Sequence, residues 1–324
     1  MSTPVKLAGF VTAIAAVFAL ALVAGRAAGP VADQASDSHA AGGHSSEPSP
    51  AEPSPAEQIP GGLMVSQNGY TLSLAEPATL AGAGRRSVRF TITAPDGSPV
   101  TEYDVAHEKR LHLIAVRRDV TGFQHVHPTL DTDTGVWSTD LDLTPGTWRL
   151  FADFKATGAE ALTLGTDLEV AGAFEPATPA AENRTATVGE YTVTLDGRLS
   201  AGTDAKLTLR VSKDGQPVTD LQPYLGAYGH LVALRGGDLA YLHVHPDGTP
   251  GDGTTTPGPD VVFYAAVPSA GRYHLFLDFQ HEGVVRTAAF TVTAGADARG
   301  AHSTADPTPS RTGTPADQGS HSGH

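Results

Sequence analysis

Residues 88–102, VRFTITAPDGSPVTE, contain the pattern that decides the fold. A strand-like run leads into an Asp-Gly pair, which is a typical two-residue hairpin turn. The same pattern returns at 207–220 as LTLRVSKDGQPVTD. A strand, an Asp-Gly turn and a second copy of both predict β structure that has been duplicated within one chain.

Further segments recur in the same order along both copies. GYTLSL at 69–74 matches EYTVTL at 190–195, LHLIAV at 111–116 matches GHLVAL at 229–234, and PGTWRLFADF at 145–154 matches AGRYHLFLDF at 270–279. The strand-like runs alternate as a half-buried strand requires, with Tyr191, Val193 and Leu195 on one face. Each copy spans about 110 residues, the size of an immunoglobulin-type sandwich. We therefore predict an all-β fold of two tandem antiparallel β-sandwiches, Ig-like or cupredoxin-like.

The segments outside the repeats differ in composition. Residues 7–25 are apolar and uncharged, which predicts an N-terminal helix that is either a transmembrane anchor or a cleaved signal peptide. Residues rich in Pro, Ala and Ser follow, and their composition is typical of a disordered linker. The predicted organisation is 1–26 anchor or signal, 27–60 linker, 61–172 first sandwich, 173–183 linker, 184–294 second sandwich and 295–324 disordered tail.

The overall composition excludes several functions. The net charge is −14, which disfavours nucleic acid as a partner. No polybasic patch is present, so we expect membrane contact only through the N-terminal helix. The chain has no cysteine, which excludes disulfides, thiolate metal sites and a blue-copper centre.

Histidines carry the functional signal. The chain has 14 histidines, and five of them lie in the linker and the tail. Three pairs occupy matching positions in the two copies, so each copy contains one histidine, twelve further residues and then His-x-His. The matched residues are His112, His125 and His127 in the first copy and His230, His243 and His245 in the second.

Strand geometry predicts that each triplet gathers on one face. The two histidines of His-x-His point to the same side of a strand. A two-residue turn at Gly236-Gly237 would place His230 opposite His243. In the first copy, alternative loops would place His112 opposite either His125 or Thr129.

Three imidazoles on one face are typical of a metal site. We predict that each triplet binds Cu(II) or Zn(II) with one coordination position open. Asp153 and Asp278 occupy matching positions and could either supply a fourth ligand or orient a ligand histidine. His274, which alternates with Asp278 on the same strand, is a further candidate ligand. A structural role for these residues is the alternative, and we expect His281, in a loop, to be exposed.

The motif RDVTGFQHVHP at 118–128, followed by PGTWRLFADF, resembles a group of exported bacterial β-sandwich proteins. Members of that group carry an Asp-Leu-x-x-Phe-x-His-x-His-Pro stretch and are associated with heavy-metal and copper handling. Val120 replaces the leucine, Trp148 replaces a tyrosine in the following strand, and Tyr241 replaces the phenylalanine in the second copy. The resemblance implies an extracytoplasmic β-sandwich more firmly than it implies an activity.

We expect a binding protein rather than an enzyme. The chain lacks a nucleophile elbow, a phosphate loop, a dinucleotide fingerprint and a His-Glu-x-x-His motif. Three hypotheses remain: a displayed metal-binding protein, an Ig-like module that binds a protein partner, and a metal-dependent enzyme.

Overall fold

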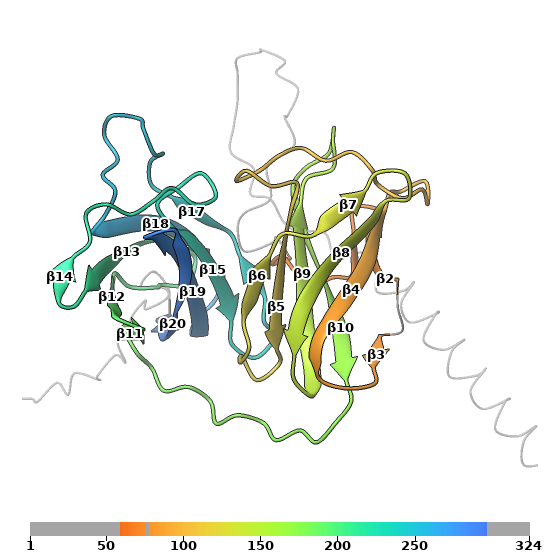
Figure 1. Cartoon of the computed structure of the whole chain (residues 1–324), viewed down its shortest axis with the longest axis horizontal. Coiled ribbons are helices and arrows are strands. Elements are labelled where there is room, and N and C mark those ends of the chain that lie inside the picture. Colours follow the sequence, from red (N-terminus) through yellow and green to blue (C-terminus); the bar gives the residue numbers. More distant parts are fainter. Residues whose placement is uncertain (1–58, 76–77, 297–324) are drawn as a thin grey trace, which may run out of the picture. The chain divides into compact units, whose positions relative to one another are not determined.

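The computed structural model describes residues 59–75 and 78–296. Within those ranges every regular element is a β-strand, and the strands form two sandwiches that follow one another along the chain (Figure 1). The predicted fold class is confirmed. The predicted N-terminal helix, most of the linker 27–60 and nearly all of the tail lie outside the described residues. In the described part of the chain, no helix is long and apolar enough to cross a membrane.

The first sandwich consists of two five-stranded sheets. One sheet has the order β1-β2-β4-β8-β7 and the other the order β3-β10-β9-β5-β6. The strands are β1 (Ser66–Gln67), β2 (Tyr70–Leu74), β3 (Thr79–Leu80), β4 (Gly84–Thr93), β5 (Leu111–Arg117), β6 (Gln124–Val126), β7 (Thr129–Asp131), β8 (Val136–Leu143), β9 (Gly146–Phe154) and β10 (Leu162–Val170). All neighbours are antiparallel except β3, which runs parallel to β10.

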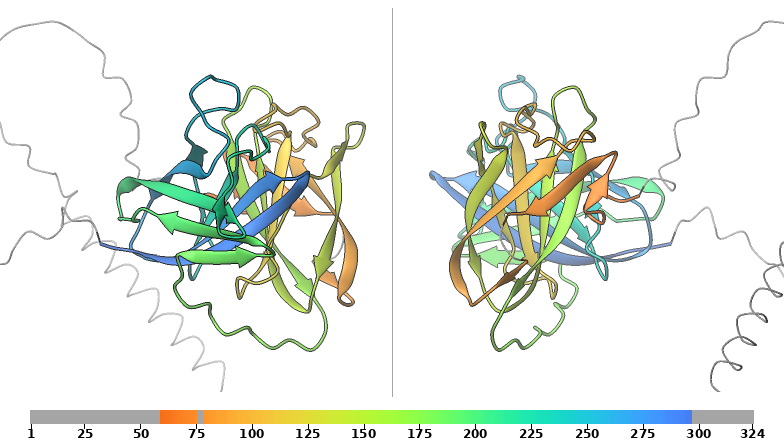
Figure 2. Two further views of the ribbon diagram at one scale, coloured as in Figure 1. Left: turned by 60° about the vertical axis from the view of Figure 1, so that its left-hand side comes forward. Right: turned by 90° about the vertical axis from the view of Figure 1, so that its right-hand side faces the viewer.

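The second sandwich repeats this plan. Figure 2 shows the two sandwiches from two further sides. One sheet has the order β11-β12-β13-β18-β17 with β14 beside β13, and the other has the order β16-β15-β19-β20. The strands are β11 (Thr185–Val188), β12 (Tyr191–Asp196), β13 (Thr203–Lys213), β14 (Gln216–Pro217), β15 (His230–Arg235), β16 (Tyr241–Leu242), β17 (Val244–Pro246), β18 (Asp260–Val267), β19 (Gly271–His281) and β20 (Val284–Ala294).

The Asp-Gly turn of the second copy forms as the sequence predicts. Lys213 pairs with Gln216 across a two-residue loop, and both loop residues, Asp214 and Gly215, have positive φ angles of 50° and 76°. Two positive φ angles define the type I′ turn, whose twist matches that of the flanking strands. This turn therefore fixes the β13–β14 register.

Each sandwich encloses its own apolar core, and a third apolar cluster joins the two sandwiches. Alternate residues of β5 divide between these cores, because Leu113 faces the interior of the first sandwich while Ile114 faces the third cluster. Strand β15 divides in the same way, with Leu231 inside and Val232 in the third cluster. The outer faces of the β5 and β15 sheets therefore pack against each other.

Aromatic pairs across this contact are reciprocal. Phe123 of the first sandwich stacks on Phe276 of the second, with ring centroids 4.0 Å apart. Phe151, the counterpart of Phe276, lies 5.8 Å from Tyr241, the counterpart of Phe123. The contact thus repeats itself under exchange of the two copies, as an isologous dimer interface does.

Residues 61–64 strap the two sandwiches together. Tyr241 N of the second sandwich donates a hydrogen bond to Gly61 O of the strap. On the side of the first sandwich, Gly62 N donates to Thr163 O of β10, and Gly165 N of β10 donates to Met64 O. A Cβ added to Gly62 would lie 2.3 Å from the Phe151 ring. Glycine is therefore required where the strap passes over the contact.

Candidate metal centre

The first histidine triplet assembles at the contact between the sandwiches. Strand β5 places His112 on its outer face, and β6 pairs with β5 so that Ile114 lies opposite His125. Continuing this register places His127 opposite His112, which differs from both alternatives predicted from the sequence. Six residues, 118–123, separate the two strands, and the turn that they form sets the register.

Three ring nitrogens converge in this triplet. His112 Nδ1 lies 3.0 Å from His125 Nε2 and 3.3 Å from His127 Nε2. Among the described residues, His112, His125 and His127 form a group in which one ring nitrogen of each lies within 4.8 Å of the other two. Two nitrogens bound to one zinc ion, each about 2.0–2.1 Å from it at a tetrahedral angle, are about 3.3 Å apart. The spacing therefore fits a shared ion.

Neighbouring acceptors set the tautomers of two of these rings. His112 Nε2 lies 3.1 Å from Ala106 O, a carbonyl that can only accept, so the ring proton is on Nε2. His125 Nδ1 lies 2.8 Å from Asp278 Oδ2 and donates to it. In the neutral rings, His112 Nδ1 and His125 Nε2 then both present lone pairs to the same point. Two facing lone pairs at 3.0 Å repel each other unless a cation lies between them.

Burial favours the neutral form, which binds metal, for His112 and His127. Burial, together with the nearby His125, His107 and Lys109, lowers the pKa of His112 to about 4, although the hydrogen bond to Ala106 O acts in the opposite direction. Burial together with His125 and His112 lowers the pKa of His127 to about 3. Protons therefore do not compete with a metal ion for His112 and His127 near pH 7.

The same shifts predict how the metal-free protein responds to acid. Burial also holds the pKa of His230 well below its ordinary value. Between the unfolded pKa of about 6.5 and the lower folded values, the unfolded chain binds more protons, so falling pH favours unfolding. Asp153 has the opposite effect on stability below pH 6, because burial raises its pKa to about 6. The contribution of this one carboxyl is smaller than the combined contribution of the three imidazoles.

We expect the free energy of unfolding of the metal-free chain to fall by on the order of 2 kcal/mol between pH 7 and pH 4.5. Urea titrations in the presence of chelator at several pH values measure this quantity. Stability that stays level or rises over that window would contradict the assignment of neutral, buried histidines.

Both predicted carboxylates lie beside the triplet, on strand β9 and on its counterpart β19. Asp153 pairs in register with His112, and Asp278 pairs in register with His230. Each accepts a hydrogen bond from a threonine of the next strand, Thr163 for Asp153 and Thr287 for Asp278. Asp278 orients a histidine of the other copy, His125, a contact across the sandwiches that the sequence analysis did not predict.

The second triplet is arranged differently. Ala233 pairs with Leu242 and Leu234 with Tyr241, so the β15–β16 loop is longer than the expected two residues and the predicted pairing of His230 with His243 is wrong. The chain then leaves this sheet, and β17 pairs with β18, which places His245 opposite Tyr264. In the first copy, β6 stays beside β5 through Val126. The earlier crossing between sheets separates His243 and His245 from His230.

The members of the second triplet have separate surroundings. The His230 ring lies 4.8 Å from the His125 ring and 5.4 Å from the His112 ring, so it adjoins the first triplet. The His243 and His245 rings lie 4.1 Å from each other, and both residues are exposed. Within the described ranges, these three histidines are not brought together as a group that could hold an ion.

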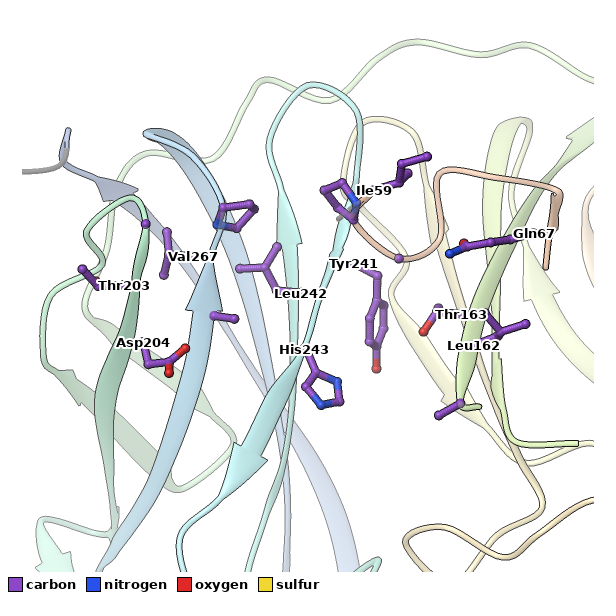
Figure 3. A pocket seen from close by; sticks show the side chains of 16 residues that line it. Ile59, Gln67, Leu162, Thr163, Thr203, Asp204, Tyr241, Leu242, His243 and Val267 are labelled. Atoms are coloured by element: carbon purple, nitrogen blue, oxygen red, sulfur yellow. The ribbon is translucent and has the colours of Figure 1, made fainter. Parts of the chain in front are cut away.

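His243 faces a cleft instead. This cleft of about 530 Å³ is lined by both sandwiches and by residues 59–61, which lead into the strap. Figure 3 shows Tyr241 and His243 on one wall, with Leu162 and Thr163 of β10 on the other. None of the first triplet lines it.

Two further histidines have structural partners. His274 is buried on β19 and lies within hydrogen-bonding distance of Thr291 Oγ1, 3.2 Å away, rather than near the triplet. His281, expected to be exposed, is buried at the end of β19. Its Nδ1 lies 2.8 Å from the Tyr191 hydroxyl and its Nε2 lies 3.0 Å from Asp220.

Comparison with solved structures finds remote likenesses. The structure of InvD from Yersinia pseudotuberculosis shares 16% identity over 75% of this chain and 62% of its own, with a TM-score of 0.23. Escherichia coli alpha-2-macroglobulin activated by porcine elastase shares 13% identity over 70% of this chain and 20% of its own, also with a TM-score of 0.23. This chain therefore spans less than two thirds of either protein. A comparison with curated proteins finds no match.

A family model matches most of the chain. The match falls on residues 65–172 and again on residues 186–296, which are the two sandwiches. The chain thus belongs to the family described as "Domain of unknown function (DUF8832)" and contains two copies of that domain.

Proposed function

We propose that this protein binds one Cu(II) or Zn(II) ion through His112, His125 and His127, outside the cytoplasm, and acts in metal binding or buffering. The observation that carries the proposal is the convergence of three imidazole nitrogens with spacings of 3.0 and 3.3 Å. The extracytoplasmic location rests on the apolar run at 7–25, which lies outside the described residues.

A shared proton accounts for this geometry less well than a metal ion. One proton between His112 Nδ1 and His125 Nε2 would satisfy those two atoms. It would leave His127 Nε2, 3.3 Å from His112 Nδ1, without a partner. A metal ion serves all three nitrogens at once and leaves a position open for water.

The ligand set narrows the choice of metal. Three neutral imidazoles suit Cu(II) and Zn(II), and the chain provides no cysteine. The sequence places one ion in each sandwich, whereas the geometry supports one ion in the first sandwich, because the second triplet is divided between two sheets.

Binding without catalysis is the simpler role for this site. His112 is buried, and the side chain of His125 is 2% exposed because the second sandwich covers it. A substrate would have little access to an ion held there. The alternative that the sequence offers is a protein that binds a protein partner. Only the fold class supports that role.

The duplication offers a matched pair of variants for testing this proposal. We expect His127→Ala to weaken binding of Zn(II) and Cu(II) by more than about 100-fold, since loss of a supporting contact alone costs about 10–100-fold. Its counterpart His245→Ala should leave the affinity unchanged. Calorimetric titration of the chelator-stripped full chain measures both.

Equal effects of the two variants, or no binding tighter than the histidines of the linker and tail provide, would contradict the proposal. One tight ion per chain is the expected stoichiometry. Two tight ions, one lost with each variant, would restore the arrangement of one site per sandwich.

A further inference from the structure

The most informative contact at the site joins the two sandwiches. His125 belongs to β6 of the first sandwich, and the carboxylate that it contacts, Asp278, belongs to β19 of the second. The two side chains are 2% and 3% exposed. A hydrogen bond to a charged group that is shielded from water is strong and directional.

The second sandwich holds Asp278 firmly in place. Thr287 of β20 donates a hydrogen bond of 2.6 Å to Asp278 Oδ1, which leaves Oδ2 for His125. β19 pairs with β15 on one side and with β20 on the other, so Asp278 lies on an interior strand. Its position therefore depends on how the whole second sandwich docks.

We propose that Asp278 is a positioning residue for the metal ligand His125, so that metal binding and docking of the two sandwiches stabilise each other. This inference rests on the proposed function, because it concerns the same site. Asp278 keeps the proton of His125 on Nδ1 and thereby keeps the Nε2 lone pair directed at the ion. Linkage requires the reverse effect as well: an ion that holds His125 in this orientation favours the docked state.

The surrounding contacts show what docking involves. Phe276, two residues before Asp278, stacks on Phe123, two residues before His125. The His230 ring, from the strand beside Asp278, lies parallel to the His112 ring within 5°. Apolar packing and the ligand-orienting hydrogen bond therefore form together when the sandwiches dock.

The first sandwich contains a matched control. Asp153 is the counterpart of Asp278 and accepts an equivalent bond from Thr163, 2.9 Å long. Within the described residues, Asp153 has no hydrogen bond to a histidine of the triplet. The two aspartates share threonine support and differ in their contact with a ligand.

The first arm of the test compares Zn(II) affinity in the full chain. We expect Asp278→Asn to weaken binding about 10–100-fold, because an amide nitrogen facing His125 Nδ1 would move the ring proton to Nε2. Asp153→Asn should stay within about threefold of the wild type, and Thr287→Val should fall between the two. Equal losses in the two asparagine variants would overturn the proposal in favour of a general charge effect.

The second arm measures hydrogen exchange with and without Zn(II). Strand β15 (His230–Arg235) contributes no ligand, yet we expect Zn(II) to slow exchange there in the wild type. The slowing should disappear in Asp278→Asn. Zn(II) that binds tightly but slows exchange only in the first sandwich would overturn the linkage, even if the variants failed to fold. A wild-type chain that binds no Zn(II) would instead overturn the proposed function.

Discussion

Replacing His125 by alanine should weaken metal binding by more than about 100-fold and also destabilise the metal-free protein by roughly 3 kcal/mol. The first effect follows because His125 supplies one of the three converging nitrogens. The second follows because Asp278 would remain buried without the donor that lies 2.8 Å away. A buried carboxylate that loses its partner is costly.

A double-mutant cycle separates these two effects. Adding Asp278→Ala to His125→Ala should recover part of the lost stability, because the unpaired carboxylate is removed. It should not restore metal binding. Chemical denaturation in chelator and calorimetric titration with Zn(II) give the two quantities. If His125→Ala left stability unchanged, the contact across the sandwiches would not form in solution.

Replacing Phe276 by alanine should weaken the contact between the two sandwiches so that they unfold in separate transitions. Phe276 is 5% exposed and stacks on Phe123 at a centroid distance of 4.0 Å. Truncating a buried phenylalanine costs roughly 3–5 kcal/mol, and here the cost falls on the contact between sandwiches. We expect differential scanning calorimetry to show two unfolding transitions in the variant where the wild type shows one.

Phe174→Ala provides a control of the same chemistry at an exposed site. Phe174 is 42% exposed and contacts Arg117, so its truncation should leave a single transition close to that of the wild type. A Phe276→Ala protein that also melted in one transition at the wild-type temperature would show that the sandwiches are not held by this contact.

The fold was predictable because its signals are local and occur twice. Alternation in strands such as β12, the Asp-Gly turn at Asp214-Gly215 and the recurring segments all act over a few residues. Such patterns depend on backbone geometry and not on distant partners. The two sandwiches follow from them directly.

The sequence identifies the three histidines that converge, but it wrongly predicts that the second triplet converges as well. The sequence correctly places His125 and His127 on one face with His112, because strand alternation requires it. It does not show loop length: in the second copy a longer loop replaces the two-residue turn expected at Gly236-Gly237 and shifts the register by two. Loop conformation depends on packing, which a repeated motif does not record.

The sequence contains a pattern that predicts the contact between the sandwiches. LHLIAV and GHLVAL are apolar on both faces of their strands, and a strand with two apolar faces is buried on both sides. Ile114 and Val232, on the outer faces, meet in the third apolar cluster. That pattern predicts a covered outer face, and with it a site shared by the two copies.

We expect one ion to join His112, His125 and His127 at the contact between the sandwiches. Anomalous diffraction at the zinc edge from crystals of the Zn(II)-loaded full chain tests it most directly. We predict one strong peak bonded to His112 Nδ1, His125 Nε2 and His127 Nε2, with Asp278 still bonded to His125 Nδ1. A peak at His243 and His245 instead, with none at the triplet, would show that His112, His125 and His127 do not form the metal site.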